Sequence, residues 1–114
     1  MGHRNEFGRS AEHLVADYYE HLGYRVLDRN WRVRTGEIDL VCAHGTTVVF
    51  CEVKARSTGR FGAGVDAVDH RKQRRVRSLA VSWLAQSDVH YLDVRFDVAD
   101  VDSRGTIDLR QGCF

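Results

Sequence analysis

The sequence predicts an α/β fold with two main helices and about five strands, in the order α-β-β-β-α-β-β. Three observations support this prediction. Apolar residues recur at helical spacing in two segments, residues 6–22 and 66–86. Three runs rich in β-branched and aromatic residues lie between these segments, and two more follow the second one. The chain of 114 residues has the usual length of one domain, so we expect a single domain over residues 1–114.

The first helical segment carries one apolar stripe and ends at a glycine. The stripe consists of Phe7, Ala11, Leu14, Val15, Tyr18 and Leu22. Gly23 follows at the position where helices commonly end in a left-handed turn. Glu12 lies one residue from Ala11, at the edge of the stripe. From the pattern alone, Glu12 is better interpreted as a solvated side chain than as part of a site.

The three runs after this helix predict strands at about residues 24–31, 37–43 and 47–53. A short polar link containing Gly45 joins the second and third strands, which is typical of a hairpin. Side chains alternate between the two faces of a strand, so the number of loop residues decides which side chains lie together. The sequence leaves open whether that number is even or odd.

An even loop would place three charged side chains on one face of the hairpin, namely Asp39, Glu52 and Lys54. With a two-residue loop, position 39 stands directly opposite position 52, and opposed Cβ atoms lie about 4.5–5.5 Å apart. Two carboxylates so close repel each other unless a cation or a shared proton intervenes. Cys42 and Cys51 would fall on the other face, where small apolar side chains suit a core.

The second helical segment follows a loop over residues 55–65 that contains three glycines. Asp66 is the predicted N-cap. The buried stripe is predicted to consist of Val68, Val76, Leu79, Ala80, Trp83 and Leu84. Lys72 falls on this stripe, so its side chain either reaches outward from the edge of the core or reaches the charged face of the hairpin. The runs at residues 89–102 and 106–110 predict the last two strands.

Composition limits the classes of protein that this chain can be. It has three cysteines and no CxxC pair, which argues against a disulfide framework or a structural zinc site and favours a reducing compartment. The chain contains no apolar run of membrane-spanning length, and its N-terminus lacks the apolar stretch of a signal peptide. We therefore expect a cytoplasmic protein with no membrane partner.

The net charge of +1 conceals an uneven distribution of charge. Between Lys54 and Arg77 there are eight lysines and arginines but two acids. A basic surface attracts polyanions such as nucleic acids, although a solvated helix face would give the same pattern. The residues that we expect to contact nucleic acid are Arg56, Arg60, Arg71, Lys72 and Arg75.

Two carboxylates and a lysine on adjacent strands suit metal-assisted hydrolysis of a phosphodiester. Asp39 and Glu52 offer the oxygen ligands that Mg²⁺ prefers, and Mn²⁺ could take its place. Such a metal polarises the phosphate and activates water. Lys54 would neutralise charge on the phosphate oxygens or orient the attacking water.

Four segments of the chain, covering about residues 8–100, resemble the YraN family of bacterial predicted nucleases. They read GRSAEHLVADYYEHLGYRVLDRNWR, GEIDLV, VVFCEVKAR and VDHRKQRRVRSLAVSWL. That family is similar to archaeal Holliday junction resolvases and to the broad PD-(D/E)xK group. The resemblance implies a restriction-endonuclease-like fold, in which two main helices flank a central mixed β-sheet of about five strands.

The resemblance also implies roles for individual residues. Asp39 and Glu52 would be metal ligands, and Lys54 the catalytic lysine. Glu12 matches the glutamate of the first helix, so the resemblance adds it as a catalytic residue and a metal ligand. Arg56 matches the arginine after the Glu-x-Lys motif, and Lys72-Gln73 matches a polar motif beside the site. Ile38 stands where the motif has proline.

These observations lead to an expected function and two alternatives. We expect a Mg²⁺-dependent endonuclease that acts on DNA, including branched or structured DNA, and that forms a homodimer to present two sites to two strands. RNA is not excluded as the substrate. The first alternative is a nucleic-acid-binding module of the same fold that does not cleave and acts with a partner nuclease or helicase. The second is a satisfied ion-pair network without catalytic function.

Overall fold

The computed structural model describes residues 3–56 and 69–114, with side chains from residue 9 onward. The described elements follow the predicted order α-β-β-β-α-β-β. They are α1 (His3–His21), β1 (Arg25–Val33), β2 (Gly36–His44), β3 (Thr47–Ala55), α3 (His70–Gln86), β4 (Asp93–Val101) and β5 (Ile107–Arg110). No helix in this part of the chain is both long and apolar enough to cross a membrane.

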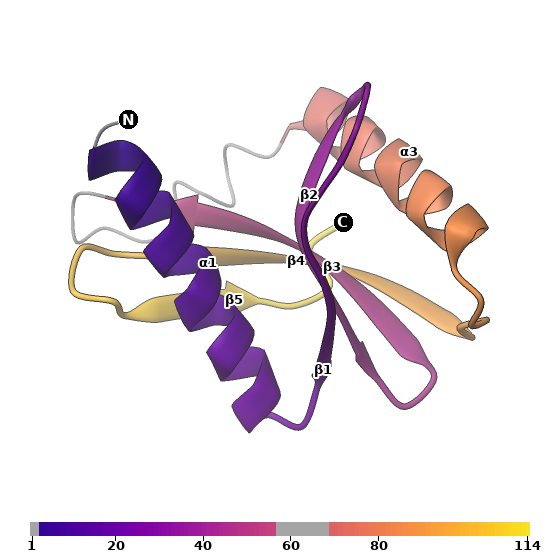
Figure 1. The fold of residues 1–114 in the computed structure, drawn as a ribbon, viewed down its shortest axis with the longest axis horizontal. Coiled ribbons are helices and arrows are strands. Elements are labelled where there is room, and N and C mark those ends of the chain that lie inside the picture. Colours follow the sequence, from indigo (N-terminus) through magenta and orange to yellow (C-terminus); the bar gives the residue numbers. More distant parts are fainter. Residues whose placement is uncertain (1–2, 57–68) are drawn as a thin grey trace.

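The five strands form one mixed sheet in the order β1-β2-β3-β4-β5. Strands β3 and β4 are parallel, and every other neighbouring pair is antiparallel. Parallel neighbours need a crossover connection, and α3 lies within the one that joins β3 to β4. The two helices lie against opposite faces of the sheet (Figure 1). These findings confirm the predicted α/β fold with its central mixed sheet.

Each helix packs on the sheet through its own apolar cluster. The α1 cluster joins the helix to Leu40, Cys42, Val49 and Cys51 of the hairpin, together with Ala99 and Val101 of β4. The α3 cluster joins Leu79, Ala80 and Trp83 to Ile38, Val41, Val48 and Phe50. Alternate residues of β2 and β3 thus serve opposite cores, which is why these strands read as nearly continuous apolar runs.

The buried face of α1 differs from the predicted stripe. The buried residues are Ala11, Val15, Ala16 and Tyr19, whereas the predicted Leu14, Tyr18 and Leu22 are 37–45% exposed. Two alanines on the inner face allow the helix to approach the sheet closely. Tyr19 turns inward because its hydroxyl has a buried hydrogen-bond partner, Asp97. The prediction is thus confirmed for Ala11 and Val15 and wrong for Leu14, Tyr18 and Leu22, because the spacing of apolar residues does not reveal the polar contact that turns Tyr19 inward.

The start of α3 also differs from the predicted one. The helix begins at His70, and the carboxylate of Asp69 accepts a hydrogen bond from the Lys72 amide at 2.9 Å, which makes Asp69 the N-cap. The predicted N-cap, Asp66, lies outside the described residues. The buried face of the helix consists of Val76, Leu79, Ala80 and Trp83, as the spacing predicted, and Leu84 is partly buried against the same cluster. Val68, also predicted for this stripe, lies outside the described residues.

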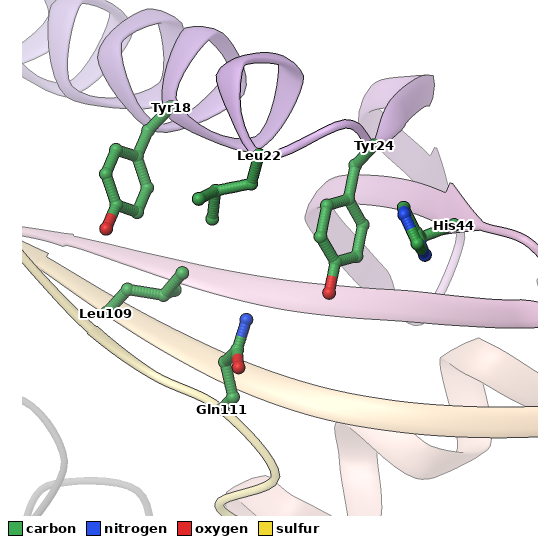
Figure 2. A pocket seen from close by; sticks show the side chains of 6 residues that line it. All are labelled: Tyr18, Leu22, Tyr24, His44, Leu109 and Gln111. Atoms are coloured by element: carbon green, nitrogen blue, oxygen red, sulfur yellow. The ribbon is translucent and has the colours of Figure 1, made fainter.

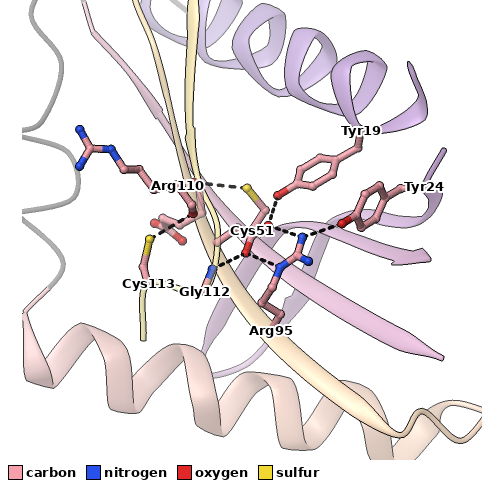
Figure 3. Close-up of polar contacts among 9 residues, drawn as sticks. Tyr19, Tyr24, Cys51, Arg95, Arg110, Gly112 and Cys113 are labelled. Atoms are coloured by element: carbon pink, nitrogen blue, oxygen red, sulfur yellow. Dashed lines mark hydrogen bonds and ion pairs between the residues drawn. The ribbon is translucent and has the colours of Figure 1, made fainter. Parts of the chain in front are cut away.

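A buried carboxylate on β4 ties α1 and the C-terminal segment to the sheet. Asp97 is fully buried. Its two oxygens accept hydrogen bonds from the Tyr19 hydroxyl at 2.6 Å, from the Arg95 guanidinium at 2.9 and 3.0 Å, and from the Gly112 amide at 3.0 Å. Arg95 also donates to the hydroxyl of Tyr24 (Figure 3). The carboxylate is therefore paired and saturated, which compensates for its removal from water.

Replacing Tyr19 by phenylalanine should destabilise the fold without creating a large cavity, because only the hydroxyl group is removed. The substitution leaves one oxygen of the buried Asp97 short of a donor, so we expect the free energy of unfolding to fall by about 1–3 kcal/mol. Urea denaturation at neutral pH measures this difference. The matched control is Tyr18→Phe on the next, exposed position, for which we expect a change within about 0.5 kcal/mol. Equal losses in the two variants would contradict the role assigned to Asp97.

Candidate functional site

The register of the β2–β3 hairpin brings the predicted charged residues together. The ladder runs from His44 paired with Thr47 to Leu40 paired with Cys51, so the loop at Gly45-Thr46 has two residues. This even loop confirms the register on which the sequence argument depended. Continued by one residue, the register sets Asp39 opposite Glu52. Both hairpin cysteines are buried in the α1 cluster, while Glu52 reaches a side chain of α3 on the other face.

Strand β2 leaves β3 at Asp39. The β2–β3 ladder ends at Leu40, whereas β2 continues to pair with β1 as far as Gly36. The Val53 amide, one residue pair beyond Glu52, donates a hydrogen bond to Asp39 Oδ2 at 2.8 Å. The carboxylate of Asp39 therefore accepts a hydrogen bond from a β3 amide beyond the end of the β2–β3 backbone ladder.

The same point of β2 is twisted out of regular strand geometry. Ile38 packs in the α3 cluster, but Leu40, two residues later, packs in the α1 cluster. On a regular strand these two side chains would share a face. On the neighbouring strand β1, Asn30 lies across from Asp39, between the pairs Arg29–Leu40 and Trp31–Ile38. Its φ angle of 50° is in the left-handed region. This twist places Asp39 at the junction of the two faces, within reach of groups from both helices.

Two lysines hold the carboxylate of Glu52. The ammonium of Lys72, from α3, lies 2.6 Å from Glu52 Oε1, and that of Lys54 lies 3.5 Å from the same oxygen. The sequence left open whether Lys72 points away or reaches the charged face, and the structure places it at the charged face. Asp39 and Glu52 are then flanked by two cations, one of which the Glu-x-Lys motif does not contain.

Burial and neighbouring carboxylates raise the pKa of two acids of the site, Asp39 and Glu12. Burial, together with the charge of Glu52, raises the pKa of Asp39 to about 7, even though the hydrogen bond from Val53 works in the opposite direction. Burial also raises the pKa of Glu12, which interacts with the charges of Glu37 and Glu52. These groups favour a bound proton or cation, which is the electrostatic pattern of many functional sites.

The pKa values of the two lysines shift in opposite directions. Burial and the neighbouring Lys72 lower the pKa of Lys54. Burial also disfavours the charged form of Lys72, but its contacts with Glu52, Lys54 and Asp39 outweigh this effect and raise its pKa. Lys72 is thus the stronger counter-ion of Glu52, and Lys54 is the amine that gives up its proton more readily.

Glu12 lies half-buried beside this group and does not face bulk solvent. Burial and the charge of Glu52 raise the pKa of Glu12, whereas the Asn30 side chain lowers it. Within the described residues, however, no three His, Cys, Asp or Glu side chains are gathered closely enough to hold a metal ion. The set expected from the resemblance, Asp39, Glu52 and Glu12, is therefore not assembled as a three-ligand cluster. One or two carboxylates, completed by water and a phosphate, are still a usual site for Mg²⁺.

A cavity of about 330 Å³ opens beside these residues. Its lining is formed by Thr35, Gly36, Glu37, Asp39, Glu52, Lys72, Arg75, Val76 and Leu79. A separate cavity of about 470 Å³ lies between the end of α1 and the β2–β3 turn (Figure 2). Tyr18, Tyr24 and His44 line that second cavity, which contains none of the carboxylates. Of these two cavities, the first places acids and bases next to each other.

The residues predicted to contact nucleic acid are placed differently from one another. Arg75 lines the cavity with the carboxylates, and Arg71 is exposed near the start of α3. Arg56 is instead paired with Asp100, a fully buried residue of β4, through an Nε–Oδ1 distance of 3.2 Å. Arg60 lies outside the described residues.

Asp100 is a charged residue near the site that was not predicted from the sequence. In the parallel register between β3 and β4 it stands beside Lys54, so it belongs to the charged face of the sheet. Arg56 Nη2 and Asp100 Oδ2 are both buried, and neither has a hydrogen-bond partner among the described residues. The signal that pointed to Asp39, a charge within an apolar strand, was also present in FDVADV. It could have identified both Asp97 and Asp100.

Comparisons with known proteins agree with one another. The sequence model of the uncharacterised protein family UPF0102 matches residues 11–101. A UPF0102 protein of Mycolicibacterium vanbaalenii is 52% identical over 98 residues, which cover 86% of this chain and 81% of the relative. One from Rhodococcus opacus is 46% identical over 101 residues, covering 89% and 86%, and one from Frankia casuarinae is 44% identical over 106 residues, covering 93% and 90%.

The raised pKa of Asp39 predicts a stability that falls with rising pH. The folded state binds the Asp39 proton more tightly than the unfolded state, so its contribution is greatest below the ordinary value of 3.8 and is lost as pH rises through about 7. Asp39→Asn removes this effect and keeps an acceptor for Val53. Relative to the unmodified protein, we expect this variant to gain about 2 kcal/mol between about pH 5.5 and 8.5.

Denaturant unfolding in the presence of a metal chelator measures this gain. Asp88→Asn, a change at an exposed aspartate, is the matched control and should show no such dependence on pH. An Asp39→Asn variant that tracks the unmodified protein at both pH values would show that Asp39 stays ionised in the folded state.

Proposed function

We propose that this chain, which belongs to the uncharacterised protein family UPF0102, is a metal-dependent endonuclease that hydrolyses DNA phosphodiester bonds. The observation that carries the proposal is the pairing of Asp39 and Glu52 at one cavity with the ammonium groups of Lys54 and Lys72. Acids that can hold a cation, beside amines that can hold an anion, match the charge of a metal-bound phosphate.

The two carboxylates are the residues that would hold Mg²⁺ or Mn²⁺. When bound, the metal would polarise the phosphate and lower the pKa of a coordinated water. Asp39 can contribute Oδ1, because its Oδ2 already accepts from the Val53 amide. The hydrogen bond fixes the orientation of the carboxylate before any ligand arrives, so less entropy is lost when a cation binds.

The lysines would then change partners. In the structure both contact Glu52 Oε1, and a phosphate oxygen offers them an alternative anion. Lys72, whose pKa is raised, would remain charged and neutralise the phosphate. Lys54, whose pKa is lowered, is better suited to orient the attacking water and to exchange a proton with it. Glu12, from α1, would act beside them through its charge.

The resemblance to PD-(D/E)xK nucleases and archaeal Holliday junction resolvases supports a restriction-endonuclease-like site and a branched or structured DNA substrate. The ExK portion of that motif corresponds to Glu52 and Lys54, which lie on one face of β3, 3.5 Å apart. A homodimer would present two such sites to the two strands of one substrate. A cytoplasmic location fits the three free cysteines.

One observation favours the second candidate, a nucleic-acid-binding module that does not cleave. The 2.6 Å contact between Lys72 and Glu52 fills a carboxylate oxygen that a metal would need. If this ion pair persists when nucleic acid binds, the site holds phosphate through its lysines alone. Such a module would act together with a partner nuclease or helicase, on DNA or on RNA.

Cleavage of defined substrates tests the proposal. Purified protein is incubated with single-stranded, duplex and four-way-junction DNA, with and without Mg²⁺ or Mn²⁺. We expect cleavage that requires the metal and that falls at least about 100-fold in Glu52→Gln, because this change removes charge at the reacting centre. Glu20→Gln, on the exposed face of α1, is the matched control and should cleave as the unmodified protein does.

The same experiment separates the two candidates. Metal-dependent cleavage by both the unmodified protein and Glu20→Gln supports the nuclease. Binding of DNA with no cleavage under any metal would reject the nuclease and support the binding module. An absence of binding to any of the DNA substrates at low salt would reject both for DNA, since phosphate contacts are strongest there.

A further inference from the structure

The end of the β1–β2 hairpin stands free of the rest of the sheet. Beyond the last β2–β3 pair at Leu40, residues 36–39 of β2 pair only with β1, through Trp31–Ile38, Arg32–Glu37 and Val33–Gly36. We call residues 30–39 the arm. The arm rises from the sheet beside α3 (Figure 1). It is a two-stranded ribbon whose base is Asp39 and whose tip is Arg34-Thr35.

The arm is held against α3 by a close contact at Gly36. A Cβ atom at this position would lie 3.2 Å from a methyl group of Leu79, and φ at Gly36 is 153°, so the site favours glycine. Trp31 and Ile38 of the arm also pack in the α3 cluster. The arm is therefore held in place by its packing on α3. The cavity that Asp39 and Glu52 line lies between the arm and α3.

Arginines lie on both elements that flank this cavity, the arm and α3, and one of them, Arg75, lines it. On the arm, Arg32 and Arg34 line a further hollow of about 280 Å³ that shares Gly36 and Glu37 with the main cavity. On α3, the exposed arginines are Arg71, Arg74, Arg75 and Arg77, of which Arg77 lies over the ring of Phe96. Arg32 is paired with Glu37 at 3.0 Å, but Arg34, Arg74 and Arg75 have no ion pair among the described residues. Arginines without an ion pair on both the arm and α3 favour binding of a polyanion that contacts both elements.

We infer that the arm enters the major groove of double-stranded DNA, so that Arg34 contacts the phosphates of one strand while Asp39 and Glu52 face the other. The inference rests on the proposed function for the identity of the polyanion, and it adds the class of substrate. A two-stranded ribbon is one of the shapes that the major groove of B-DNA admits.

The length of the arm supports a duplex over a single strand. Asp39 lies five positions after Arg34, which corresponds to about 17 Å along a strand. The major groove is about 12 Å wide, so a ribbon of this length reaches from the phosphates on one side of the groove to those on the other. The tip and the base of the arm are then suited to contact different strands.

The salt dependence of binding tests this inference. Binding of a fluorescent duplex, and of a single strand of the same length, is measured with chelator present between about 50 and 200 mM salt. On the duplex, Arg34→Ala should reduce the slope of log K against log salt by about 0.9, which is the loss of one phosphate contact. On the single strand, its slope should not change. Arg25→Ala, an exposed arginine at the opposite end of β1, is the matched control and should change neither slope.

The possible results distinguish failure of the inference from failure of the proposed function. If the unmodified protein binds the duplex but Arg34→Ala keeps its slope, the arm does not contact DNA and only the inference is rejected. Equal losses on the duplex and on the single strand would reject the assignment to two strands. If the unmodified protein binds neither probe at low salt, the proposed function is rejected as well. Thermal unfolding of Arg34→Ala excludes a folding defect.

Discussion

The site depends on the hydrogen bond between the Val53 amide and the carboxylate of Asp39. Where β2 leaves β3, the amides of β3 lose their backbone acceptors, and an unpaired buried amide costs about as much as a lost hydrogen bond. Asp39 supplies an acceptor at that point. The same side chain thus ends the ladder, lets the arm turn toward α3 and presents an acid at the opening.

Beside Asp39, the side chains of Glu52, Lys54 and Lys72 form a group of opposite charges that compensate one another. Glu52 is only 14% exposed and would be costly to bury without the two lysines. Lys54 and Lys72 would repel each other without Glu52. Removing Glu52 leaves two lysines without their shared partner, and removing Lys72 weakens the compensation of Glu52, so these three side chains depend on one another. A bound anion or cation would redistribute this balance.

Much of this arrangement could be predicted because it follows from short-range rules. The two-residue loop at Gly45-Thr46 fixes the register of the hairpin, and the period of a strand then assigns Asp39 and Glu52 to one face. The order of the elements follows from the spacing of apolar residues. Each of these inferences depends on neighbours in the sequence.

Other features could not be predicted because they depend on contacts between distant segments. Tyr19 is buried in preference to Tyr18 because Asp97, 78 residues later, accepts its hydroxyl. Asp100 joins the charged face only through the parallel register with β3. The arm exists because one strand departs from its neighbour, and no local sequence pattern marks that departure.

The two cysteines of the β2–β3 hairpin allow opening of the hairpin to be measured by thiol modification. Cys42 and Cys51 lie on β2 and β3 in the α1 cluster, behind the carboxylates, and burial raises the pKa of both thiols, that of Cys42 to about 12. A thiol reagent can reach them only when the strands open, whereas Cys113 is partly accessible in the folded chain. The rates at which the natural thiols are modified would therefore report how often the hairpin beneath the site opens, with no foreign label introduced.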